Sequence, residues 1–204
     1  MADLFTAAGA DRLMTVDLHT AQIQGYFDGP VDHLLAMPIL TRYVKNNYGD
    51  QPLAVVSPDA GRIKVAESWA NALGGAPLAF IHKTRDPRRP NESKANRVVG
   101  EVEGRTCILV DDLIDTGGTI VQAAEALKAD GAADVVIAAT HAVFSGPAVD
   151  RLKNSVAREV VVTNTLPLSD EQRFDSLTVL SIAPLLAQAT AAVFEDGSVT
   201  SLFS

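Results

Sequence analysis

CILVDDLIDTGGT, residues 107–119, runs from a stretch of apolar residues into three acids and a turn of threonine and glycine. Apolar residues at helical spacing follow, until Gly131 ends the pattern: Ile120, Ala123, Ala124 and Leu127. The segment therefore predicts a strand, a loop and a helix in succession. Parallel α/β sheets build phosphate sites in this way, because glycines let the backbone approach a ligand and free N–H groups at a helix start attract an anion.

The acids of this segment predict a second feature of the ligand. Asp111 and Asp112 would lie at the carboxyl end of the strand, beside the crevice where such sheets bind their ligands. Carboxylates repel a phosphate unless they bind hydroxyl groups or a metal ion. A sugar phosphate with a ribose diol fits both parts of the segment, and Thr116 and Thr119 add hydroxyl donors. The alternative is an ordinary acidic loop that caps the helix.

The composition is that of a globular protein. The 204 residues are 47% hydrophobic and 21% charged, and 17 basic against 25 acidic side chains give a formal net charge of −8. This charge argues against a nucleic-acid-binding face, and no apolar run reaches the roughly 20 residues that a membrane span needs. Cys107 is the one cysteine, and its apolar strand favours a core position over a disulfide or a catalytic role. We expect a cytoplasmic protein that binds neither nucleic acid nor a membrane.

Strand and helix patterns alternate along the chain. We predict strands at residues 12–18, 53–56, 77–82, 97–102, 106–111, 135–140 and 159–163. Helices are predicted at residues 1–8, 21–27, 38–48, 147–154 and 182–194, and another ends near Gly74. The alternation implies an α/β fold with a mostly parallel sheet and helices on both of its faces.

Three other segments carry residue types suited to chemistry. DLHT, residues 17–20, ends one strand, and SPDAG, residues 57–61, leads another strand into a helix. Taken alone, each is a weak indication of a binding site, because His19 fits a structural histidine, the usual role of a lone histidine, and Asp59 fits the N-cap region of a helix. Residues 83–97 form a polar loop with six basic and two acidic side chains, a local charge of +4. This is either a solvated loop or a lid that closes on a polyanion, poorly ordered without its ligand.

Together these segments resemble the ribose-phosphate pyrophosphokinases, also called phosphoribosyl pyrophosphate synthetases. The matching segments are DLHTAQIQGYF (17–27), SPDAG (57–61), HKTR (82–85) and DDLIDTGGT (111–119). The first and third are not shared with ordinary phosphoribosyltransferases.

The resemblance implies a phosphoribosyltransferase-type fold and a reaction. The diphosphoryl group of MgATP would be transferred to the anomeric hydroxyl of ribose 5-phosphate, giving phosphoribosyl pyrophosphate and AMP for nucleotide biosynthesis. The alternatives are a non-catalytic or truncated homologue that binds sugar phosphate or nucleotide, and a phosphoribosyltransferase.

The resemblance also implies a role for each group of residues. Lys83 and Arg85 would be catalytic and stabilise the transition state, with Arg85 also at the sugar phosphate. The ribose 5-phosphate site would further comprise Asp111, Asp112, Asp115, Thr116, Gly117, Gly118 and Thr119. The MgATP site would comprise His19, Asp59, Ala60, Gly61 and Arg62, with His19 and Asp59 as ligands of the Mg²⁺ cofactor. Arg62 departs from the family pattern, in which glycine often follows SPDAG.

A domain division and partners follow from the resemblance as well. Residues 1–36 would be a remnant of an N-terminal phosphoribosyltransferase-like domain, and residues 37–204 the C-terminal domain with the ribose 5-phosphate site. The family implies a homo-oligomer, a hexamer built of dimers, with phosphate or ADP as regulators. Hydroxyl groups near the end of the chain would either help to bind the regulator or belong to a plain surface strand: Ser198, Thr200 and Ser201.

Overall fold

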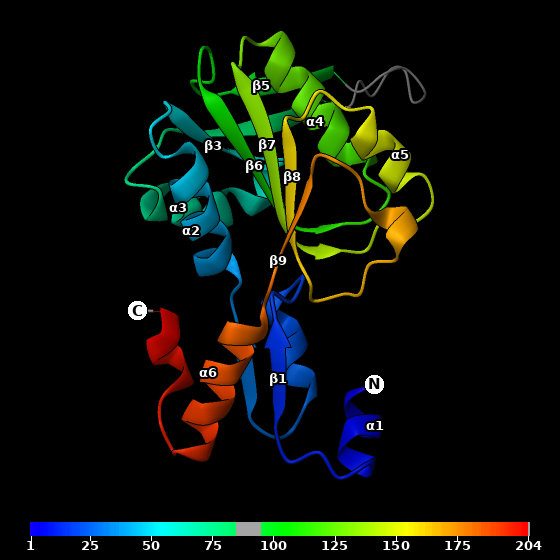
Figure 1. Ribbon diagram of the computed structural model, residues 1–204. Helices are drawn as coiled ribbons and strands as arrows, with labels where there is room; N and C mark the ends of the chain where they lie inside the picture. The colour runs from blue at the N-terminus through cyan, green and yellow to red at the C-terminus, as the bar shows by residue number, and fades with distance from the viewer. Residues whose placement is uncertain (85–94, 204) are drawn as a thin grey trace.

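A sheet of seven strands forms the centre of the larger part of the molecule (Figure 1). The computed structural model describes residues 1–84 and 95–203, and of residues 83, 84, 95 and 96 the backbone alone. The strands lie in the order β5-β4-β3-β6-β7-β8-β9. Their bounds are β3 Leu53–Ser57, β4 Leu78–Thr84, β5 Ala95–Val99, β6 Thr106–Ile114, β7 Asp134–Ala142, β8 Glu159–Thr163 and β9 Leu177–Leu180. All neighbours are parallel except β4 and β5, so the predicted α/β fold with a mostly parallel sheet is confirmed.

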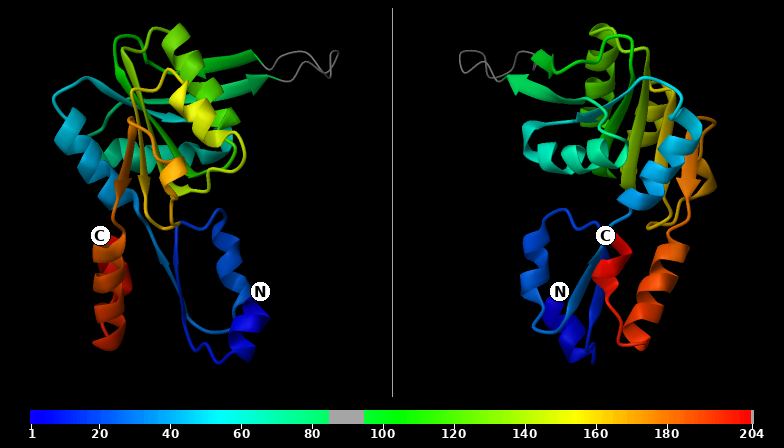
Figure 2. Two further views of the ribbon diagram at one scale, coloured as in Figure 1. Left: turned by 45° about the vertical axis from the view of Figure 1, so that its right-hand side comes forward. Right: turned by 90° about the vertical axis from the view of Figure 1, so that its left-hand side faces the viewer.

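Helices cover both faces of this sheet (Figures 1 and 2). α2 Met37–Tyr48 and α3 Ile63–Ala72 pack on one face, and α4 Gly118–Ala129 and α5 Ala148–Lys153 on the other. Alternate side chains of a strand point to opposite faces. Cys107 and Leu109 of β6 accordingly join the core under α4, whereas Ile108 and Val110 join the core under α2 and α3. This burial on both faces explains the unbroken apolar run of β6.

A second, two-stranded parallel sheet lies at one end of the molecule (Figure 1). It consists of β1 Leu13–Val16 and β2 Val31–Leu34, accompanied by α1 Ala2–Ala7 and the 3₁₀ helix η1 Ala21–Tyr26. α6 Ala183–Phe194 and η4 Val199–Phe203 return from the far end of the chain and lie beside it (Figure 2). Leu185 and Ala189 of α6 share one core cluster with Met14 and Leu34. The division of the chain at residue 36 stays a prediction.

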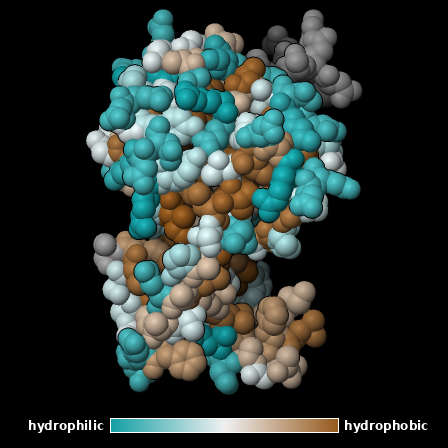
Figure 3. Space-filling model, in the orientation of Figure 1, coloured by the Kyte–Doolittle hydropathy of each residue, from teal (hydrophilic) through white to brown (hydrophobic). Residues whose placement is uncertain are grey.

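Hydrophobic residues connect the two sheets. On the face drawn in Figure 3 they gather across the middle of the molecule, where the small sheet meets the large one. One core cluster contains residues of β1 and β2 together with residues of β3, β6 and β7. No helix in residues 1–84 and 95–203 combines the length and the apolar character needed to cross a membrane.

Most predicted elements are present within a few residues. β2 and β9, each of four residues, are not predicted from the sequence. The helix predicted at residues 21–27 is a 3₁₀ helix. The polar loop expected at residues 83–97 is shorter than expected, since β4 continues to Thr84 and pairs antiparallel with β5 from Ala95. The rest of that loop, and the expectation about its order, lie outside the described residues.

Gly100 and Gly104 offer a matched test of backbone packing. Gly100 has a φ of 122°, and a Cβ there would lie 2.7 Å from both the Leu78 carbonyl oxygen and the Ala79 Cβ. Gly104 has a φ of 68°, with nothing within 4 Å of a Cβ. We expect Gly100→Ala to lower the free energy of unfolding by about 3 kcal/mol and Gly104→Ala by about 1 kcal/mol, because only the first adds a clash to the backbone strain. Urea unfolding of both variants measures the difference, and equal losses would contradict the clash.

Candidate active site

A pocket of about 320 Å³ opens where the turns after β1, β3 and β6 meet. These turns follow the carboxyl ends of their strands, which is where open α/β sheets bind ligands. The pocket is lined by His19, Asp59, Arg62, Asp111, Asp112, Leu113, Ile114, Asp115, Thr116, Gly117, Gly118, Thr119 and Ile120. Ten of the residues predicted from the sequence for the two substrate sites are therefore gathered around one cavity.

The turn between β6 and α4 presents amide groups to this pocket. Gly117, the N-cap of α4, has a φ of 73°, which glycine adopts without strain. The first hydrogen bond of the helix runs from the Val121 amide to the Gly117 carbonyl (3.1 Å). The preceding amides, those of Gly118, Thr119 and Ile120, belong to the first turn, where α-helices leave N–H groups without a helical partner. The helix dipole adds to their attraction for an anion.

The carbonyl groups of the same turn are occupied from the side of α5. The amides of Phe144 and Ser145 donate to the carbonyls of Ile114 and Asp115, both at 3.0 Å. The Arg151 guanidinium donates through Nη1 to the Thr116 carbonyl (2.9 Å). These bonds hold the loop in one shape and neutralise oxygens that would otherwise repel a phosphate. Sequence analysis missed Arg151, because α5 lies one strand later in the chain and nothing local marks the contact.

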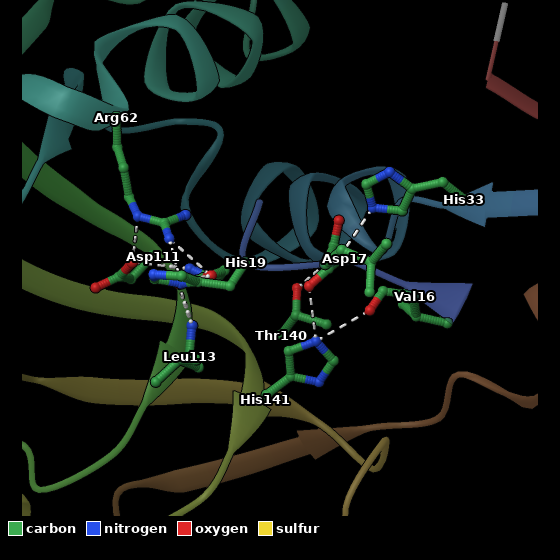
Figure 4. A network of polar contacts seen from close by, with 11 residues as sticks. Val16, Asp17, His19, His33, Arg62, Asp111, Leu113, Thr140 and His141 are labelled. Atoms are coloured by element: carbon green, nitrogen blue, oxygen red, sulfur yellow. Dashed lines mark hydrogen bonds and ion pairs between the residues drawn. The ribbon is translucent and has the colours of Figure 1, made fainter. Parts of the chain in front are cut away.

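Asp111 and Asp112 form the acidic side of the pocket, and Figure 4 shows Arg62 and His19 beside Asp111. Arg62 bridges them, with Nε 3.2 Å from Asp111 Oδ1 and Nη2 2.7 Å from Asp112 Oδ2. His19 Nδ1 lies 2.6 Å from the same Asp112 oxygen. Side-chain exposure is 9% for Asp112 and 19% for Arg62, so these ion pairs are largely shielded from water. They are accordingly stronger than surface pairs.

The protonation of His19 follows from its neighbours. Its Nδ1 also lies 2.9 Å from Arg62 Nη2, but a guanidinium cannot accept a hydrogen bond. The ionised Asp112 carboxylate only accepts, so the proton lies on Nδ1 and the Nδ1–H group donates to Asp112, as Arg62 does. The His19 side chain is 63% exposed, and its Nε2 makes no hydrogen bond to the described residues. This atom is free to meet a ligand.

The two acids differ in their affinity for a proton. Burial, together with the hydrogen bond to Asp112, raises the pKa of Asp111 to about 7, although Arg62 opposes the shift. Burial also acts to raise the pKa of Asp112, but hydrogen bonds from Asp111, His19 and Arg62 outweigh it and hold that pKa below its ordinary value. Asp112 is thus the carboxylate that stays ionised, and Asp111 is the one that exchanges a proton near neutral pH.

His19 and Asp59 are the residues predicted to hold Mg²⁺. Asp59 caps the 3₁₀ helix η2 Ala60–Arg62, and its Oδ1 accepts a hydrogen bond from the Gly61 amide (2.8 Å). Its other oxygen and His19 Nε2 make no hydrogen bond to the described residues, and both side chains line the pocket. Within residues 1–84 and 95–203, no group of three or more His, Cys, Asp or Glu could hold a metal ion. This donor set fits an ion that takes most of its ligands from water and substrate phosphates, as Mg²⁺ commonly does.

Some predicted residues lie outside the cavity lining. Ala60 and Gly61 belong to η2, beside Asp59 but not among the lining residues. Lys83 lies on β4, where only its backbone is described. Arg85 lies outside the described residues. Ser198 precedes η4, and its hydroxyl lies 3.0 Å from that of Thr200.

A family model described as the phosphoribosyl synthetase-associated domain matches residues 83–204 of this chain. The ribose-phosphate pyrophosphokinase of Mycobacterium leprae is 64% identical over 203 residues, which make up 100% of this chain and 62% of that protein. That of Bifidobacterium longum is 64% identical over 98% of this chain and 60% of its own length. The crystal structure of phosphoribosylpyrophosphate synthetase from Mycobacterium smegmatis, 61% identical, superposes with a TM-score of 0.89 over 96% of this chain and 63% of that one. The chain thus spans about three-fifths of the length of these relatives.

The raised pKa of Asp111 predicts how the stability of the ligand-free protein depends on pH. A carboxyl whose pKa rises from about 4 to about 7 on folding binds a proton in the folded state that the unfolded state releases. Its contribution to stability is complete below pH 4 and is lost as the pH rises towards 7. Relative to Asp111→Asn, the wild type should therefore lose unfolding free energy across this range.

Urea unfolding of the wild type and Asp111→Asn in steps from pH 4 to pH 7 measures this difference. Asp130→Asn, at an acid outside the pocket, controls for the general effect of removing one carboxylate. A difference between wild type and Asp111→Asn that stays constant with pH would contradict the raised pKa.

Proposed function

The chain belongs to the ribose-phosphate pyrophosphokinase family, and from this membership we propose that it carries the ribose 5-phosphate site and part of the MgATP site of an enzyme that makes phosphoribosyl pyrophosphate. In the proposed reaction the anomeric hydroxyl of ribose 5-phosphate attacks the β-phosphorus of ATP. The diphosphoryl group is transferred and AMP leaves. We propose that the enzyme acts in nucleotide biosynthesis in the cytoplasm.

One observation supports this proposal above all: the anion cradle and the pair of acids face the same pocket. The 5-phosphate would accept hydrogen bonds from the first amides of α4 and from the hydroxyls of Thr116 and Thr119. The ribose hydroxyls would donate to Asp111 and Asp112. A phosphate alone would use the first half of this site and a sugar alone the second, so a sugar phosphate is the ligand that uses both.

The MgATP side is proposed for the turns after β1 and β3. His19 and Asp59 would hold Mg²⁺, which neutralises charge on the transferring phosphates when it is bound. The η2 turn with Ala60, Gly61 and Arg62 would face the diphosphoryl group. Arg62 bridges the two acids in the ligand-free protein. Binding of the ribose hydroxyls to these acids would release its guanidinium for a phosphate.

Lys83 and Arg85 are proposed to stabilise the transition state, where charge accumulates on the phosphoryl oxygens. The position of Lys83 supports this role. Phe80 of β4 is paired with Ser57, the last residue of β3 before the Asp59 turn. Lys83 follows Phe80 by three residues, so the chain runs past that turn on its way to Arg85. No nucleophilic side chain is required, because phosphoryl transfer depends on in-line positioning and charge neutralisation.

Oligomeric state and regulation are proposed on the same basis. We propose a homo-oligomer, a hexamer built of dimers, with phosphate or ADP as regulators. A truncated homologue that binds sugar phosphate or nucleotide without turnover is the second candidate, because the chain spans 62% of the length of its relative from Mycobacterium leprae.

Ligand binding to the 204-residue chain tests the two sides of the pocket separately. We expect ribose 5-phosphate and plain sulfate to bind at the start of α4, because the amides and the helix dipole are local to it. Thr119→Ala and Asp115→Ala should weaken ribose 5-phosphate binding about tenfold through lost polar contacts. MgATP should bind weakly and AMP release should be absent or very slow.

Titration calorimetry and an AMP-release assay provide these measurements. Thr6→Ala, at an exposed threonine of α1, is the matched control for Thr119→Ala and should leave binding unchanged. Ribose 5-phosphate affinity that is the same in Thr119→Ala as in the wild type would remove the phosphate from the proposed position. Tight MgATP binding with rapid AMP release would refute the second candidate.

Lys83→Ala tests the proposed catalytic role in a longer version of the chain that extends over the full length of the relatives. We expect kcat to fall about a hundredfold or more with little change in ribose 5-phosphate affinity, because the positive charge acts in the transition state. Lys153→Ala, at the exposed end of α5, is the control. An unchanged kcat with only a raised KM would assign Lys83 to substrate binding instead.

A further inference from the structure

Two polar residues of β7 hold the segment that carries His19, although neither lines the pocket. Thr140 is buried and His141 is partly buried, near the carboxyl end of a strand whose residues 135–139 are all apolar. Both contact the chain where β1 ends (Figure 4). The sequence gives one indication of these two residues, because the apolar run of β7 changes to polar residues at Thr140 and His141.

The segment needs support because its backbone is strained at Asp17. β1 ends at Val16. Asp17, the next residue, has a φ of 41°, in the left-handed region that residues other than glycine rarely adopt. The Asp17 amide still donates to the Leu34 carbonyl (2.9 Å) on β2. Beyond this point the chain leaves the small sheet. A strained backbone of this kind persists only where its surroundings determine it.

The Asp17 side chain provides the first anchor. Its Oδ2 accepts a hydrogen bond from the Thr140 hydroxyl (2.6 Å) and another from the Ala36 amide (3.0 Å). One carboxylate oxygen thus joins the end of β1 to β7 of the large sheet and to the start of α2.

His141 provides the second anchor. Its Nε2 lies 3.1 Å from the Val16 carbonyl and 3.0 Å from the Asp17 carbonyl. Carbonyl oxygens only accept, so Nε2 carries a proton and donates to them. The opposite nitrogen, Nδ1, lies 2.8 Å from the Thr165 hydroxyl, which fixes the plane of the ring. The imidazole therefore supplies the hydrogen-bond donor for both of these backbone carbonyl groups.

A third contact continues the same arrangement by one residue. The Leu18 amide donates to Nε2 of His33 on β2 (2.9 Å). Side chains thus hold backbone groups of three consecutive residues before His19, from 16 to 18. The His19 ring then reaches Asp112 of β6. In the sheet register Leu113 of β6 is paired with His141 of β7, so the anchor and the target of this segment lie on neighbouring strands.

We propose that Thr140 and His141 are positioning residues for His19. They fix the strained turn at Asp17, so that His19 points Nδ1 at Asp112 and presents Nε2 to the MgATP side of the pocket. They touch neither the sugar phosphate nor the nucleotide. The link to MgATP rests on the proposed function, whereas the placement of the His19 ring does not.

Paired substitutions at each residue separate positioning from simple loss of structure. Thr140→Val keeps the shape and removes the hydroxyl donor, whereas Thr140→Ser keeps the hydroxyl. His141→Leu removes the donor to both carbonyls, and His141→Gln restores an N–H group near the position of Nε2. Melting temperatures of all four variants are recorded first, and if Thr140→Val does not fold, the His141 pair carries the test.

The ring of His19 is observed directly by ¹⁵N NMR of the ligand-free chain, with its signals identified by their loss in His19→Gln. We expect Thr140→Val and His141→Leu to shift the Nδ1 signal away from its Asp112-paired value and to reduce the broadening of the ring signals by added Mn²⁺. Thr140→Ser and His141→Gln should retain the wild-type signals. In calorimetry the first two variants should weaken MgATP binding about tenfold, as loss of an orienting contact does at metal sites, and keep sulfate affinity within about twofold.

The outcomes distinguish this proposal from the proposed function. If the wild type binds neither ribose 5-phosphate nor MgATP while the His19 signals shift in Thr140→Val and His141→Leu, the function is wrong and the positioning role stands. If folded Thr140→Val and His141→Leu both retain the wild-type His19 signals, the positioning role is wrong.

Discussion

Two carboxylates on consecutive residues cannot both stay ionised in a shielded pocket unless positive groups face them. At the end of β6, Arg62 bridges Asp111 and Asp112, and the Nδ1–H group of His19 donates to Asp112, which stays ionised while Asp111 exchanges a proton near neutral pH. Arg62 and His19 come from the turns after β3 and β1, so three separate turns meet at this pair of acids. The phosphate cradle of α4 starts only a few residues beyond the acids. The pocket therefore joins an acidic half to an electropositive half, which is the arrangement that a sugar phosphate requires.

The fold was predictable where one principle dominated a segment. The apolar run of β6 and the helical spacing after it indicated a doubly covered parallel strand, and the structure has one. β2 and β9 were not predictable, because their strand form depends on neighbours distant in sequence.

The candidate site was predictable to the extent that its residues lie in short contiguous motifs. The motifs at residues 111–119, 57–61 and 17–20 contain most of the residues that line the pocket. They could be recognised because residues that act together there are also adjacent in the sequence. The supports were not predictable. Arg151 reaches the Thr116 carbonyl from α5, and His141 reaches the Asp17 carbonyl from β7, so each contact exists only after the sheet has formed. Arg62 was predictable in part. Its motif predicted a place near a phosphate but gave no indication that Arg62 bridges two acids.

The position of α6 determines the order in which the molecule can be completed during synthesis. α6 shares a core with β1 and β2, although every strand of the large sheet lies between them in the sequence. Translation delivers the small sheet before the large one and the covering helix α6 after both. Until α6 leaves the ribosome, the apolar side of the small sheet has no permanent cover, and such exposed surfaces are the ones that chaperones bind. The small sheet is thus synthesised before the large sheet but reaches its final neighbours after it.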